Sequence, residues 1–166
     1  MSKSLYGVLM VCALFVAAAQ LPAVAEEAAC GAVPERSEEA AVRQAFVYSI
    51  TVGMVKGLQL TGREVSTEQQ ARLRGVAEES FTKIYARIKA AGLAEDYKKQ
   101  MFDPDIRKFD KQVLEAKTMS EIAPIAQAQM KALNEKYPKL VEFMNTDREF
   151  QAITMEMMQK IAKALK

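Results

Sequence analysis

The chain has 166 residues, the length of one domain, and its 23 lysines and arginines against 21 aspartates and glutamates leave a formal net charge of only +2. Nucleic-acid binding needs a basic surface, so this near-neutral composition argues against that class of function. The chain has no histidine, which removes the usual general base of enzymes, the histidine-dependent nucleophiles and the two-histidine zinc motifs.

The N-terminus has the pattern of a secretory signal peptide. Lys3 precedes an apolar run at residues 5–19, and the small-residue sequence Ala-Val-Ala follows at 23–25. A basic start, an apolar run too short to span a bilayer and such a cleavage site together predict export. We therefore expect a bacterial signal peptide at 1–25, cleavage after Ala25 and a periplasmic or secreted mature chain. A retained membrane anchor is the alternative.

Cys30 is the one cysteine that remains after cleavage, because Cys12 lies in the signal peptide. A single thiol cannot form an internal disulfide. The sequence AACG at 28–31 partly resembles the lipobox at which bacterial lipoproteins are cut and acylated, although Glu27 replaces the usual aliphatic residue. We favour an incidental or intermolecular thiol over lipidation, and expect membrane association only if Cys30 is acylated.

Residues 26–36 are small and acidic and predict a flexible arm, followed at 37–166 by an all-α bundle of four to six helices. The first helix is expected from Ser37, as its N-cap, to Leu60. Residues 45–60 carry one charge, Lys56, and are apolar on nearly every side. Such a helix is expected to be buried, so we predict that it is the centre of the bundle.

Gly53 and Gly57 stand one turn apart in this first helix. Each glycine costs about 1 kcal/mol relative to alanine unless close packing compensates. The pair indicates either close approach of a second backbone or room for a small apolar ligand between helices.

Capping signals predict where the later helices begin. Ser66 with Gln69 matches a capping box, and Thr118 with Glu121 repeats that chemistry. Asp103 before Pro104 predicts a cap followed by a first-turn proline, which we favour over the start of a calcium loop. No stretch predicts a strand.

Residues 65–69, VSTEQ, also resemble the Leu-Thr-x-x-Gln motif of periplasmic chaperones of the Spy and CpxP type. Valine and serine stand where that motif has leucine and threonine, and the second copy of the motif is missing. The resemblance implies an exported helical chaperone, while a capping box explains the same residues.

Methionine is abundant, with ten residues in the chain. The sequence at 155–158 offers Met155, Met157 and Met158, whose thioethers are soft ligands suited to Cu(I). We favour a core role for Met157, which belongs to an apolar stripe, because methionine fills irregular gaps. Met155 and Met158 remain the candidates for soft-metal or partner contacts.

The leading hypothesis is an exported, non-catalytic helical protein that binds another envelope protein, as a chaperone, adaptor or assembly factor. Amphipathic helices of mixed charge and methionine-bearing surfaces that can repack favour it. The alternative is a carrier that encloses a small apolar ligand, such as a lipid chain or a quinone, inside the bundle. A carboxylate-based hydrolase is the third hypothesis. We expect no cofactor, and the sequence fixes neither the partner nor the homo-oligomeric state.

Overall fold

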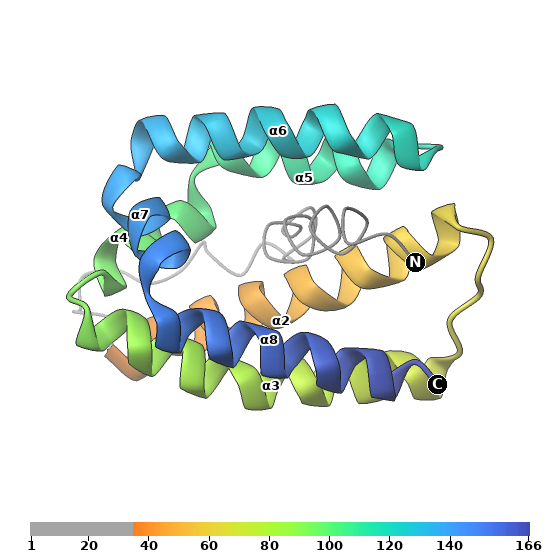
Figure 1. Cartoon of the computed structure of the whole chain (residues 1–166), viewed down its shortest axis with the longest axis horizontal. Coiled ribbons are helices and arrows are strands. Elements are labelled where there is room, and N and C mark those ends of the chain that lie inside the picture. The colour runs from red at the N-terminus through yellow and green to blue at the C-terminus, as the bar shows by residue number, and fades with distance from the viewer. Residues whose placement is uncertain (1–34) are drawn as a thin grey trace, which may run out of the picture.

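Residues 35–166 are described by the computed structural model, and they form seven α-helices without a strand (Figure 1). The all-α fold class is thereby confirmed for this part of the chain. The helices are α2 (Glu35–Leu60), α3 (Thr67–Ala90), α4 (Ala94–Phe102), α5 (Pro104–Glu115), α6 (Met119–Lys136), α7 (Pro138–Thr146) and α8 (Arg148–Ala164). The expected signal peptide at 1–25, the arm as far as residue 34 and Cys30 lie outside the described residues.

Seven helices exceed the four to six expected, because the chain turns sharply at two prolines. Pro104 and Pro138 occupy the first positions of α5 and α7, where the missing proline N–H has no helical partner to lose. The short helices α4 and α7 therefore form corners at one end of the molecule, where they connect the longer helices (Figure 1).

The largest part of the core lies where α3 packs between α2 and α8. Phe81 of α3 is fully buried, and its ring centroid lies 5.6 Å from that of Phe46 in α2 and 5.1 Å from that of Tyr85. From α8, Met157 enters the same cluster, so its predicted core role is confirmed. Burying large aromatic rings of this kind supplies much of the driving force for folding.

Helices α5 and α6 form a hairpin on the other side of α2 (Figure 1). Within the described residues, two smaller apolar clusters include side chains of this hairpin. Near the hairpin turn, Val113 of α5 packs with Val52 of α2. At the opposite end, Ile106 and Leu133 pack with Val141 of α7. The described apolar contacts thus hold the hairpin to the rest of the molecule at its two ends.

Helix α2 lies between these two layers, but its expected burial on nearly every side is only partly right. Phe46 and Ile50 are fully buried against α3, whereas Tyr48 on the same helix is 37% exposed and most side chains beyond Met54 are half-buried. The helix also begins at Glu35, upstream of the cap expected at residue 37. No helix within residues 35–166 is long and apolar enough to cross a membrane.

The capping box at Ser66 is confirmed. The backbone N–H of Gln69 donates to Ser66 Oγ at 3.2 Å, and the backbone N–H of Ser66 donates to Gln69 Oε1 at 3.0 Å. Gln69 Nε2 also donates to the carbonyl of Leu165, which ties the start of α3 to the end of α8. This capping role accounts for the residues at 65–69 that resemble the chaperone motif.

Candidate functional site

The residues singled out from the sequence lie on different helices. On α2, Gly53 is buried and Gly57 is half-buried. On α8, Met158 is half-buried against the main core, whereas Met155 is 51% exposed. The structure therefore presents Met155 on the surface and Met158 as part of the packing.

Asp103 acts as the predicted helix cap. Its carboxylate accepts the backbone N–H of Asp105 at 2.9 Å, and it also accepts from Lys136 Nζ and from the Tyr137 hydroxyl at 2.9 Å. Burial raises the pKa of Asp103, but these hydrogen bonds outweigh burial and leave the pKa below its usual value. Within residues 35–166, no group of three or more His, Cys, Asp or Glu side chains is placed to hold a metal ion.

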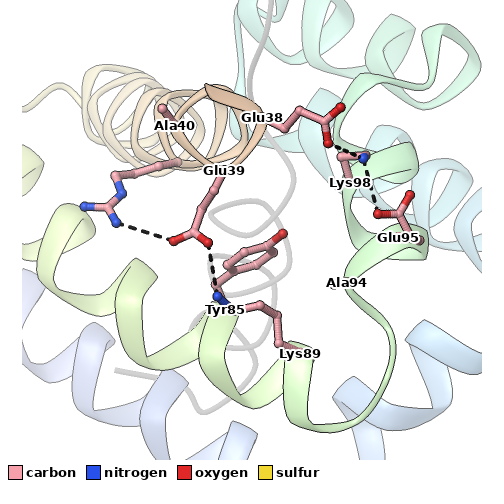
Figure 2. A pocket seen from close by; sticks show the side chains of 9 residues that line it. Glu38, Glu39, Ala40, Tyr85, Lys89, Ala94, Glu95 and Lys98 are labelled. Atoms are coloured by element: carbon pink, nitrogen blue, oxygen red, sulfur yellow. Dashed lines mark hydrogen bonds and ion pairs between the residues drawn. The ribbon is translucent and has the colours of Figure 1, made fainter. Parts of the chain in front are cut away.

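A groove of about 430 Å³ opens where the start of α2, the end of α3 and the start of α4 meet (Figure 2). We call it the charged groove. Tyr85 of α3 presents its ring between the charged side chains of the three helices. The lining residues are Glu38, Glu39, Ala40, Arg43, Tyr85, Lys89, Ala94, Glu95 and Lys98.

The charged side chains of this groove, three acidic and three basic, are paired with one another. Lys98 Nζ lies 2.7 Å from Glu38 Oε2 and 3.2 Å from Glu95 Oε1, so it joins α2 to α4. Lys89 Nζ lies 3.1 Å from Glu39 Oε2 and 4.9 Å from the centre of the Tyr85 ring. The hydrogen bond that Lys98 donates to Glu38 is the main reason that the pKa of Lys98 is raised. The groove is therefore neutral overall but carries both signs of charge.

Tyr85 supplies the aromatic surface of the charged groove. Tyr85 is 8% exposed. Its ring stacks on Phe81, and its centroid lies 6.1 Å from that of the Tyr97 ring. Burial is the main cause that raises the pKa of Tyr85, followed by the nearby Glu39 carboxylate. The phenol consequently stays neutral at ordinary pH and offers an apolar face with a polar tip.

A second groove, of about 480 Å³, runs between α3 and α8. Lys83 of α3 pairs there with Glu156 of α8 at 3.0 Å, and Arg87 pairs with Glu149 at 3.3 Å. It has the same pairing of opposite charges but no aromatic side chain in its lining. The charged groove is therefore the better candidate for recognition of a ligand with apolar groups.

The charged groove does not follow from the sequence, because its lining comes from three different helices. A signal was present: Phe81 and Tyr85 of α3 stand four residues apart, next to a row of apolar residues at helical spacing that includes Ala77, Ile84 and Ile88. Together these residues make a wide apolar face, which indicates a helix with neighbours on two sides. Helix α3 has those two neighbours, α2 and α8.

Comparisons of the chain with models of known protein families, with curated proteins and with solved structures found no match. The function is therefore argued from the geometry of its sites.

Proposed function

We propose that the protein is an exported, non-catalytic binding protein that holds a segment of another bacterial envelope protein, as a chaperone, adaptor or assembly factor. The signal-peptide pattern at 1–25 supports export. The observation that carries the binding role is the charged groove, with its aromatic Tyr85 surface between side chains of both signs (Figure 2).

A polypeptide segment suits this groove for two physical reasons. Its apolar side chains gain contact with the part of the Tyr85 ring that lines the groove, and this ring is rigid and loses little entropy on binding. Its charged side chains can replace partners such as Glu38 and Lys98 in the existing ion pairs, because ion pairs at the surface contribute little net stability and are exchanged at low cost. A lining with both signs of charge also tolerates different sequences, as a chaperone or adaptor requires.

Site-specific photo-crosslinking in cells of the host tests this proposal. A photoreactive residue at Ala40, which is exposed and lines the groove, should capture a discrete envelope protein. The same residue at Ala128, an exposed alanine on α6 outside both grooves, is the matched control and should not. Lys98→Glu, which gives the neutral lining an excess of two negative charges, should reduce the crosslink several-fold. Equal labelling from both positions, or no labelling from Ala40, would refute the proposal.

A carrier for a small apolar ligand is the second candidate. The observation that favours it is a pair of largely buried donors with unmade hydrogen bonds, Gln100 of α4 and Arg107 of α5, which suit the oxygen atoms that a lipid or a quinone carries. Native mass spectrometry of the mature chain, purified from its host without refolding, tests this candidate. A bound small-molecule mass would support it, and a bare chain or a protein complex would count against it.

A further inference from the structure

Arg107, in the first turn of α5, is a largely buried cation whose hydrogen-bonding capacity is mostly unused. Its side chain is 10% exposed, and Nη1 lies 3.0 Å from Oδ2 of the fully buried Asp110 one turn later. This ion pair does not have hydrogen-bond geometry, and none of the three guanidinium nitrogens has a hydrogen-bond partner within residues 35–166. Buried polar groups are nearly always hydrogen-bonded, so such a group needs an explanation.

The ion pair with Asp110 does not satisfy the N–H donors of Arg107. Asp110 Oδ1 accepts from Gln129 Nε2 of α6 at 3.4 Å, so the carboxylate is shared between two helices. A guanidinium has five N–H donors arranged as a planar fork. The ion pair compensates the charge of Arg107, while most of these donors still lack an acceptor oxygen.

A second unused donor is on α4. Gln100 is 2% exposed, and its Nε2 has no hydrogen-bond partner within residues 35–166. It lies one turn after Tyr97, which is also buried and close enough to Arg107 for the two to influence each other electrostatically. The consecutive helices α4 and α5 thus each carry a donor side chain without an acceptor, the amide of Gln100 and the guanidinium of Arg107.

The buried face of α5, the helix that carries Arg107, is largely apolar. Ile106, Phe109 and Val113 of α5 are buried, and Ile106 packs in one cluster with Leu133 of α6. Burial is the main cause that lowers the pKa of Arg107, with Asp110 and Tyr97 opposing it. An oxygen ligand for Arg107 would therefore enter a largely apolar interior.

We infer that Arg107, assisted by Gln100, binds the anionic oxygen group of a ligand, a carboxylate or a phosphate, inside the molecule. A guanidinium fork matches the two oxygens of such a group, which makes arginine the usual side chain for this recognition. The apolar neighbours suit a hydrocarbon chain attached to the anion. The inference rests on the carrier candidate, to which it adds the chemical identity of the ligand's polar end, and is independent of the charged groove.

Calorimetric titration of the mature chain, stripped of bound lipid, tests the site with four probes: decanoate, decanol, acetate and inorganic phosphate. Binding of decanoate but not of decanol or acetate identifies an anionic amphiphile. Binding of phosphate or acetate alone identifies a free anion at the same site. Either result supports the inference. Equal binding of decanoate and decanol would leave the carrier candidate standing and overturn the anion site, and no binding of any probe would overturn both.

Variants then assign the binding to the residues. Arg107→Lys keeps the positive charge but removes the planar guanidinium with its paired N–H donors. Gln100→Leu removes the amide and leaves the ion pair of Arg107 and Asp110 unchanged. We expect each to weaken binding of the anionic probe on the order of tenfold, as the loss of a hydrogen bond to a charged group does. Arg72→Met, at an exposed arginine of α3, is the matched control and should bind as the unmodified chain does. Unchanged affinity in both Arg107→Lys and Gln100→Leu would overturn the inference.

Discussion

Asp147 shows how one side chain determines the relation between two helices. It precedes α8, and its carboxylate accepts the backbone N–H of Phe150 at 2.8 Å. The same carboxylate accepts from Arg87 Nε of α3 at 2.9 Å. The hydrogen bonds from Arg87 and then from the Phe150 backbone lower the pKa of Asp147 to about 2. One residue therefore caps α8 and fastens its start to α3.

The lowered pKa predicts a specific loss of stability in acid. A carboxylate with a depressed pKa in the folded state stabilises the fold above its unfolded pKa of about 4. That contribution disappears as the pH falls toward about 2, because the unfolded state binds the proton more readily. Urea midpoints measured from pH 5 to pH 2 should fall more steeply for the unmodified chain than for Asp147→Asn, which keeps a capping oxygen but does not titrate. Parallel curves for the two proteins would show that Asp147 does not couple to folding.

At the scale of the element, two caps that look alike in the sequence are made differently. Ser66 accepts a backbone N–H of the helix that follows it. Thr118 makes no such bond with the backbone of α6; its hydroxyl donates to Glu121 at 3.1 Å, and Glu121 in turn accepts the backbone N–H of Lys117. Hence the predicted capping box at Ser66 is confirmed, whereas the one predicted at Thr118 is wrong: its hydroxyl accepts no backbone N–H, and Glu121 accepts the backbone N–H of Lys117 instead of that of Thr118.

This difference predicts unequal costs of removing the two hydroxyls. Ser66→Ala should lower the free energy of unfolding by about 1 kcal/mol, because a backbone amide at the start of α3 loses its acceptor. Thr118→Ala should cost clearly less, because its hydroxyl bonds only to side chains at the surface. Chemical denaturation of the two variants beside the unmodified chain measures both values. Equal losses would mean that the hydroxyl of Thr118 caps α6 in solution.

At the scale of the whole molecule, the described apolar packing is uneven. The main cluster joins α2, α3 and α8 and includes stacked aromatic rings. Among residues 35–166, the α5–α6 hairpin contributes to two small clusters, and Asp110 and Gln129 are among its buried side chains. Regions with fewer buried apolar contacts open at a lower free energy than the core around them.

Native-state hydrogen exchange should therefore separate the two parts. We expect amides of α5 and α6 to exchange through openings of lower free energy than amides at the centre of α3, around Phe81. Saturating ligand at Arg107, if decanoate binds there, should raise protection in α5 above all, since binding stabilises the folded form of that site. Uniform protection across all helices would show that the molecule opens only as one cooperative unit.

The sequence by itself determined the features that depend on neighbours three or four residues apart. The all-α class, the caps at Ser66 and Asp103 and the core role of Met157 follow from local hydrogen-bonding chemistry and from helical periodicity, and the structure confirms them. These patterns are readable because one turn of a helix brings such residues together in any fold.

Only the tertiary structure decided which faces meet. The charged groove joins side chains of α2 and α4 that lie 60 residues apart, as in the pair of Glu38 and Lys98. Likewise Arg107, a surface-type residue in the sequence, is largely buried and pairs with Asp110, which also accepts from Gln129 of α6. Neither the groove nor the burial of Arg107 follows from helical periodicity. An amphipathic stripe shows that a helix packs against something, but it does not show which helix is the neighbour. The charge of each side chain is written in the sequence, whereas its exposure and its partner depend on the arrangement of the helices.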